Sequence, residues 1–186
     1  MTALVRLVIV LAVAGVLIAL ASPWLKDAVY AAQLFAAAPP AALPVPVDGV
    51  ASRAIANSWG TARSGGRQHE GVDIFARRGT PVVSTTRGLV WRIGTNNLGG
   101  NVVWVLGPGG QLHYYAHLDR VAAIRVRQRV DVGDVIGFVG TSGNAAKAPP
   151  HLHYGIYRPS GKAVDPFPLL TAPSGERNRA TADTSG

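Results

Sequence analysis

The chain from Val47 to Leu170 alternates short apolar runs with turns. The runs carry β-branched and aromatic residues, as strands do, and glycine and asparagine are concentrated in the turns between them. One turn, Gly107 to Gly110, lies between two such runs and predicts a hairpin. The pattern predicts an all-β body with a mostly antiparallel sheet, whose strands cover Thr80 to Ser84, Gly88 to Ile93, Asn101 to Leu106, Leu112 to Leu118, Val135 to Val139 and Leu152 to Tyr157.

An uncharged apolar stretch runs from Leu7 to Leu25, between Arg6 and Lys26. It fits a signal peptide with a small-residue exit near Ala21. It fits equally an uncleaved membrane anchor, just long enough to span a bilayer, with Arg6 on the cytoplasmic side. Both interpretations predict that the body is exported, to the periplasm or elsewhere in the cell envelope.

Two further segments flank the body. Ala28 to Ala38 predicts a short helix, and Pro39 to Pro46 predicts an extended tether. The segment from Thr171 is polar and predicts disorder. The expected organisation is therefore a signal peptide or anchor (1–25), a short helix and tether (26–46), the β-rich body (47–170) and a tail (171–186).

Composition narrows the chemistry. The chain has 186 residues, enough for one domain with a hydrophobic core, and its 22 glycines and 13 prolines suit a turn-rich β body. The chain has no cysteine, which excludes disulfides, thiolate zinc sites and a cysteine nucleophile. Any metal site must use imidazole and carboxylate groups.

The net charge of +8 attracts polyanions without specifying one. The basic residues are scattered singly or in pairs such as Arg77 and Arg78, with no dense tract and no aromatic-interleaved RNA-binding signature. We therefore expect a solvated basic surface and no nucleic-acid partner. The charge is compatible with an anionic cell-wall substrate, but does not identify it.

The five histidines all lie inside the β-rich body. His151 and His153 flank Leu152 in a predicted strand, so both imidazoles point to one face, where they suit a metal or proton transfer. Upstream, His69 and Asp73 lie four residues apart, where Gly71 disfavours a helix and a turn entering a strand is expected.

One Asp and two His around zinc would leave a fourth position for water, which is typical of a catalytic site. Zinc lowers the pKa of such a water toward neutrality, so a hydroxide nucleophile forms at ordinary pH. His113, Tyr115 and His117 are expected on one face of their strand. His117 could face the same groove as the other candidates, whereas a structural role is favoured for His113.

Five segments, in this order, resemble the lysostaphin-like, LytM-type family of zinc metallopeptidases, which hydrolyse peptidoglycan peptides. The resemblance spans roughly Ser58 to Pro166. Its segments are HEGVDI from His69, GTPVVSTTRGLV after it, YYAHL from Tyr114, VGDVIGFVGTSGN from Val132 and PHLHYGIY from Pro150.

The resemblance implies a groove on a mostly antiparallel sheet and one zinc ion held by His69, Asp73 and His153. It implies that His117 and His151 are the catalytic imidazoles. All five positions are intact, which argues against relatives that have lost zinc and act only as activators of other hydrolases. The loop from Ala145 to Pro150 departs from the Ser/Thr-Gly-Pro sequence common in relatives, and His113 has no role in the family pattern.

The expected function is therefore a zinc metalloendopeptidase that cuts peptide cross-links of peptidoglycan. The alternative is a non-enzymatic wall-binding or hydrolase-activating module with the same fold. The sequence indicates neither the bond that is cut nor an oligomeric state. Glycines 137, 140 and 143 are expected to allow tight turns and close backbone approach along the groove.

Overall fold

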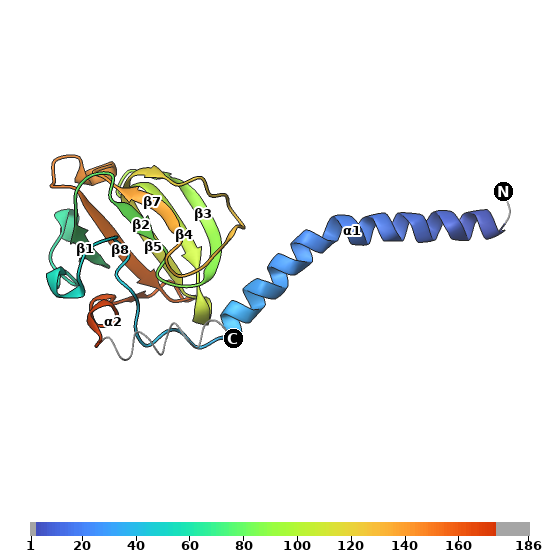
Figure 1. Cartoon of the computed structure of the whole chain (residues 1–186), viewed down its shortest axis with the longest axis horizontal. Helices are drawn as coiled ribbons and strands as arrows, with labels where there is room; N and C mark the ends of the chain where they lie inside the picture. The colour runs from blue at the N-terminus through green and yellow to red at the C-terminus, as the bar shows by residue number, and fades with distance from the viewer. Residues whose placement is uncertain (1–2, 174–186) are drawn as a thin grey trace.

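The computed structural model describes residues 3–173 of the chain. A long helix projects from a compact β body, and a short helix closes the described part of the chain (Figure 1). The elements are α1 (Ala3–Ala36), β1 (Val72–Phe75), β2 (Pro81–Val83), β3 (Gly88–Asn96), β4 (Gly100–Leu106), β5 (Leu112–Val121), β6 (Arg129–Val130), β7 (Val135–Val139), β8 (His151–Tyr157), β9 (Ala163–Val164) and α2 (Phe167–Thr171).

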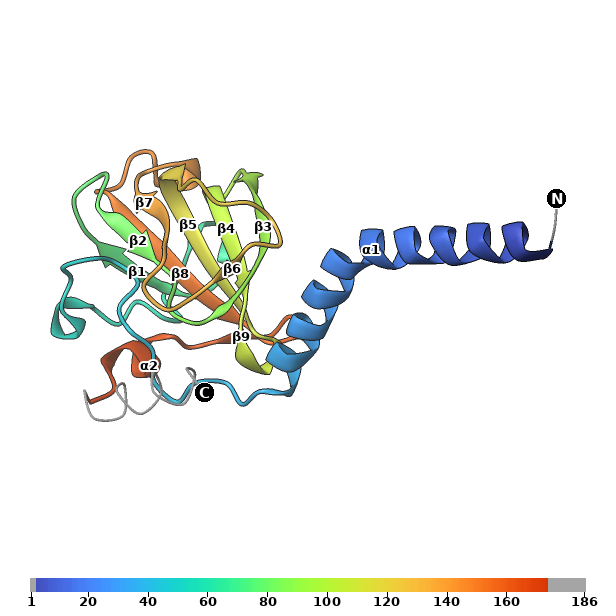
Figure 2. The same ribbon diagram turned by 45° about the vertical axis from the view of Figure 1, so that its right-hand side comes forward.

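Every strand pairing among the described residues is antiparallel. The main path runs β1-β8-β5-β4-β3-β6, so β5 and β4 lie at its centre and β1 at one edge. The smaller β7 pairs with β2 and with the far end of β5, and β9 pairs with β8 (Figure 2). The expected all-β class with a mostly antiparallel sheet is confirmed.

Alternation of side chains along β1 and β8 separates a core face from a groove face. On β8, Leu152 and Tyr154 are fully buried in the main core, and His151 and His153 point to the other side. On β1, Ile74 is in the same core. Because side chains of a strand alternate between faces, burying one row fixes the direction of the other.

The strands predicted from the apolar runs are all present, with small differences at their ends. The run Val135 to Val139 coincides with β7, and the predicted hairpin turn joins β4 to β5 through a short 3-10 turn at Pro108–Gly110. The two-residue strands β6 and β9 and the helix α2 were not predicted, since segments this short carry no periodicity of their own.

The N-terminal helix is longer than expected. The apolar stretch 7–25 and most of the predicted helix 28–38 form one helix, α1, which ends at Ala36, because Lys26 and Asp27 between them are compatible with helix. Its outer half is exposed, and its last turns pack Leu34 against Leu89 and Leu106. Among the described residues, no helix combines the length and apolarity needed to cross a membrane.

The segment after α1 is extended, as expected for 39–46, but it is not a free spacer. Leu43 and Val47 are each 1% exposed and belong to the main core. Its backbone also pairs with the body, since Leu43 N–H donates to Leu169 O and Val83 N–H donates to Pro46 O. Tertiary contacts therefore hold a segment whose composition suggests only a linker.

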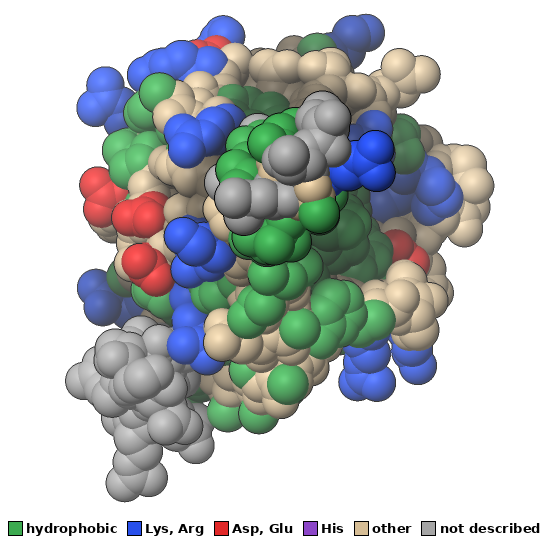
Figure 3. All heavy atoms as spheres, turned by 90° about the vertical axis from the view of Figure 1, so that its right-hand side faces the viewer, with side chains coloured by type: hydrophobic (Ala, Val, Ile, Leu, Met, Phe, Trp, Pro, Cys, Tyr) green, Lys and Arg blue, Asp and Glu red, His purple; other side chains and the backbone are tan. Residues whose placement is uncertain are grey.

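Basic side chains are spread around the base of α1 and not gathered in one patch (Figure 3). This distribution agrees with the scattered arginines of the sequence. Of the predicted tail 171–186, Thr171 ends α2, and residues 174–186 lie outside the described part of the chain.

Candidate active site

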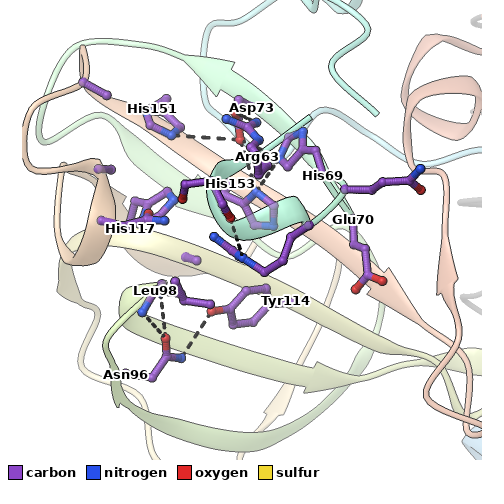
Figure 4. Close-up of a pocket in the computed structure, with 18 of the residues that line it drawn as sticks. Arg63, His69, Glu70, Asp73, Asn96, Leu98, Tyr114, His117, His151 and His153 are labelled. Atoms are coloured by element: carbon purple, nitrogen blue, oxygen red, sulfur yellow. Dashed lines mark hydrogen bonds and ion pairs between the residues drawn. The ribbon is translucent and has the colours of Figure 1, made fainter. Parts of the chain in front are cut away.

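Five side chains singled out from the sequence line one groove on the open face of the sheet (Figure 4). His69 comes from the loop before β1, Asp73 from β1, His117 from β5, and His151 and His153 from β8. The antiparallel register sets Asp73 opposite His153 and His153 opposite Ala116. Pairing of three strands thus brings together residues that are far apart in the sequence.

Three of these side chains point their polar atoms at one spot. His69 Nε2 and His153 Nδ1 lie 2.8 Å apart. Asp73 Oδ1 lies 3.1 Å from each of these nitrogens. This cluster of two imidazoles and a carboxylate can hold a metal ion, with its three ligand atoms within 4.8 Å of one another.

Hydrogen bonds behind the cluster orient it. His69 Nδ1–H donates to the carbonyl oxygen of Ser58 over 2.7 Å, so its Nε2 presents a lone pair to the cluster. The Asp73 backbone N–H donates to Ser58 Oγ over 3.0 Å, and Arg63 forms an ion pair with Asp73 Oδ2. Partners of this kind fix the tautomer and direction of metal ligands.

The electrostatics of Asp73 favour its ionised form. Burial by itself raises the pKa of this carboxyl group, but hydrogen bonds with His153 and His69 and the charges of these imidazoles outweigh burial. The net effect holds the pKa of Asp73 far below its ordinary value. The cluster therefore presents a carboxylate, the form that binds a cation.

His117 occupies a strained position on a bulge in β5. Asn101 pairs with Leu118 while Val103 pairs with Tyr115, so β5 has one more residue than β4 between these pairs. His117 has φ 61, a conformation that costs a non-glycine residue about 1–2 kcal/mol. The bulge turns His117 toward the groove, next to Ala116, which also lines it.

The bulge overturns one expectation. Strict alternation would set His113, Tyr115 and His117 on one face, but Tyr115 and His113 are fully buried on the core side. There, Nδ1 of His113 is hydrogen-bonded to the Tyr154 hydroxyl at 2.7 Å. The structural role expected for His113 agrees with this placement.

The imidazoles of His117 and His151 lie beside the metal-ligand cluster with ring centroids 4.9 Å apart. His117 Nδ1–H donates to Ser142 O over 2.9 Å, and His151 Nδ1–H donates to Pro149 O over 2.8 Å. Each Nε2 can therefore accept a proton, and that of His151 lies 4.0 Å from Asp73 Oδ1. Burial, with the nearby charges of His151 and His153, lowers the pKa of His117 to about 4, so this ring is neutral at neutral pH.

Two glycines permit this packing. A Cβ on Gly71 would lie 2.6 Å from His153 Cε1 and from the Tyr154 carbonyl oxygen. Gly143, at φ 69, lies against the backbone of Gly99 and Gly100 at the other side of the groove. The expectation of close backbone approach thus holds for Gly143 and also for Gly140, whose Cβ would clash with Asp119 N and lie 2.8 Å from His117 O. The role of Gly71 in the approach to His153 was not foreseen.

Sequence reasoning missed two residues that contact the metal-ligand cluster. Arg63 and Ser58 contact the ligands, but an arginine and a serine in a loop carry no distinguishing local pattern. Tyr114 lines the groove and accepts a hydrogen bond from Asn96 Nδ2 over 3.3 Å, with Trp104 stacked 4.1 Å from it. Tyr154 lies in the core, and Glu70 is exposed.

Comparisons with known proteins agree with this architecture. The family model described as Peptidase family M23 matches residues 67–166. The L-Ala-D-Glu endopeptidase of Bacillus subtilis (strain 168) is 46% identical over an alignment of 127 residues, which covers 62% of this chain and 39% of that protein. The chain thus spans about two fifths of the length of this relative.

Two solved structures share the fold. The catalytic domain of the antimicrobial peptidase lysostaphin from Staphylococcus simulans superposes with TM-score 0.57 at 30% identity, covering 63% of this chain and 92% of that one. A zinc containing peptidase from Vibrio cholerae superposes with TM-score 0.57 at 26% identity, and the match covers 68% of this chain and 39% of that one. Because the family model matches more than half of this chain, the chain belongs to peptidase family M23.

Proposed function

We propose that the chain is a zinc metalloendopeptidase that hydrolyses peptide bonds of bacterial peptidoglycan. The observation that carries the proposal is the convergence of His69, Asp73 and His153 in a groove that two further imidazoles also line. A binding module needs the groove, but it has no need of His117 and His151 with free Nε2 atoms beside the cluster.

His69, Asp73 and His153 would hold the zinc ion. They fit it because an ionised carboxylate and a nitrogen lone pair already face one point, and imidazole and carboxylate are zinc ligands. Three protein ligands leave a position for water, and bound zinc supplies a water of lowered pKa and a Lewis acid that polarises a carbonyl.

His117 and His151 perform the proton transfers. A neutral imidazole whose Nε2 faces the groove accepts a proton from the attacking water, and the resulting imidazolium can donate to the leaving amine. The Ser142 and Pro149 carbonyl oxygens hold the two rings by their Nδ1–H groups. Both rings have the geometry for either task, so both are assigned to proton transfer.

The substrate class comes from the relatives. A protein 46% identical to this chain is an L-Ala-D-Glu endopeptidase, and lysostaphin is an antimicrobial peptidase. We assign peptidoglycan peptides as the substrate, and place the enzyme outside the cytoplasm, in the periplasm or cell envelope. The apolar stretch from Leu7 to Leu25 would direct export as a signal peptide.

The test is digestion of purified cross-linked peptidoglycan by the full chain, followed by mass analysis of the released peptides. The proposal expects release that a zinc chelator abolishes and added zinc restores. His117→Ala, loaded with zinc, serves as the matched inactive control. If the zinc-loaded chain releases nothing but still binds the wall, the alternative function as a binding or activator module is correct.

A further inference from the structure

The charged residues of the groove are unevenly distributed. Apart from Asp73, those that line it are Arg63, Arg67 and Glu70, all on the segment just before β1. The opposite wall, which includes Asn96, Asn144 and Ala148, contributes no charged side chain among the described lining residues. One wall of the groove is therefore charged and the other is neutral.

A tight turn holds the two arginines together. Ala62 bridges Gln68, and Arg63 N–H donates to Arg67 O over 2.9 Å, so the arginines come from facing positions on either side of Ser64–Gly66. Like charges at facing positions repel each other. An anion bound between the two side chains would relieve this repulsion.

Arg63 and Arg67 have N–H donors that their present hydrogen bonds do not use, and these donors could bind such an anion. Arg67 Nε donates to Ser64 O over 3.2 Å, and among the described residues no carboxylate lies within ion-pair distance of Arg67. Arg63 contacts Asp73 Oδ2 through one terminal nitrogen, although a guanidinium carries five N–H donors. Its side chain is 37% exposed, so the remaining donors can be reached from the groove.

Glu70 does not neutralise this pair. Its carboxylate points away from the histidine cluster in Figure 4, and it forms no ion pair with any described residue. Arg67 is therefore a cation beside the metal-ligand cluster that no carboxylate of the described residues pairs with.

We propose that Arg63 and Arg67 bind a carboxylate of the substrate peptide next to the bond that is cut, which selects acidic peptides over uncharged glycine bridges. The guanidinium fork matches a carboxylate in shape and charge, and such charge-assisted bonds are the strong ones. Arg63 would contact Asp73 and the substrate together, which links substrate position to the metal ligand. This inference rests on the proposed peptidase function.

The test uses two soluble peptides that differ in one group. Both contain an alanine followed by a glutamate, and in one of them the carboxylate next to the scissile amide is converted to an amide. Arg67→Gln is the main variant, because Arg67 contacts no metal ligand. Arg125→Gln is the matched control, an exposed arginine outside the groove.

Binding is measured by calorimetry with zinc-loaded His117→Ala chains, so that the result does not depend on turnover. We expect the acidic peptide to bind about tenfold more tightly than its amide, as one charge-assisted hydrogen bond allows. Introducing Arg67→Gln into the His117→Ala chain should remove this preference, and introducing Arg125→Gln should leave it unchanged. Equal binding of both peptides, or a preference that survives Arg67→Gln, overturns the inference.

A second experiment measures cleavage of both peptides by chains that keep His117. Its outcomes distinguish a failure of the carboxylate contact from a failure of the proposed peptidase function. Arg67→Gln should raise KM for the acidic peptide about tenfold with little change in kcat, while zinc content stays the same. Chelator-sensitive cleavage of both peptides at equal kcat/KM would keep the peptidase and reject the carboxylate contact. A calorimetric preference for the acidic peptide without any cleavage would keep the contact and reject the peptidase.

Discussion

Gly71 is closely packed against a metal ligand in the groove. Gly71 lies where any Cβ would come within 2.6 Å of the His153 ring and of a backbone oxygen, so a larger residue must displace a strand or a metal ligand. The sequence shows only that Gly71 disfavours a helix. The contact arises from the pairing of β1 with β8, which no local pattern encodes.

Gly71→Ala should therefore weaken zinc binding and destabilise the fold. We expect a loss of about 1–3 kcal/mol in the free energy of unfolding, typical of overpacking. Gly94→Ala is the matched control, since the nearest atom to its Cβ would be 3.9 Å away. Chemical denaturation and zinc titration of both variants check the prediction, and equal behaviour of the two would contradict it.

His113 is the histidine that the catalytic site does not use. It is fully buried, and burial lowers the pKa of its imidazole from 6.5 to about 3. Between these two values the unfolded chain binds a proton that the folded chain does not, so stability falls as pH falls from 6.5 toward 3. The slope from this group is at most about 1.4 kcal/mol per pH unit.

Replacing His113 by Gln removes this titration. The variant should be less stable at neutral pH, because the hydrogen bond to Tyr154 changes. Its stability should nevertheless decline less steeply with acid than that of the unchanged chain. Free energies of unfolding at several pH values between 4 and 7 test the slope, and parallel curves would show that His113 is not the buried neutral group described.

At the scale of elements, the bulge in β5 is the decisive feature. Local alternation located the strands and correctly directed His151 and His153 to one face. It failed for His117 because an extra residue in one strand changes the register against β4, and only the partner strand reveals that. The sequence pattern predicts where the strand lies, but the register against the partner strand determines which face each of its side chains occupies.

Asn101 stabilises the bulge. Its side-chain Nδ2 donates to Leu118 O over 3.1 Å and to Asp119 O over 3.2 Å. Asn101→Ala removes both hydrogen bonds and leaves Leu118 O with the one that it accepts from Ser142 Oγ. We expect His117 to lose its position and turnover to fall on the order of tenfold. Zinc content should not change, because Asn101 contacts none of the three ligands.

Asn97→Ala provides the comparison, since Asn97 is exposed in the adjacent turn and does not line the groove. Steady-state rates and metal analysis of both variants decide the matter. Unchanged turnover in Asn101→Ala would mean that the bulge persists without these hydrogen bonds.

At the scale of the whole molecule, α1 and the body form one unit. Asp27 pairs with Arg127 over 2.7 Å, Arg127 stacks on Trp24 at 3.6 Å, and Leu34 is 1% exposed. The sequence predicted a helix and a loose tether here. It could not show the docking, because helix propensity and composition carry no information on contacts with residues a hundred positions away.

Leu34→Ala tests whether the helix belongs to the folded unit. Truncating a buried leucine costs about 2–4 kcal/mol, whereas a change at an exposed site stays within about 0.5 kcal/mol. Leu25, 64% exposed on the same helix, provides the control substitution Leu25→Ala. Denaturation of both full-length variants should show the difference, and equal stabilities would mean that α1 is attached without packing.

In the proposed site His69, Asp73 and His153 hold zinc, while His117 and His151 transfer protons. The decisive measurement is of zinc content and turnover in His153→Ala and His117→Ala, purified in parallel. We expect His153→Ala to lose both zinc and activity, and His117→Ala to keep one zinc per chain and lose activity. Equal loss of zinc from the two variants would contradict this division between ligands and catalytic imidazoles.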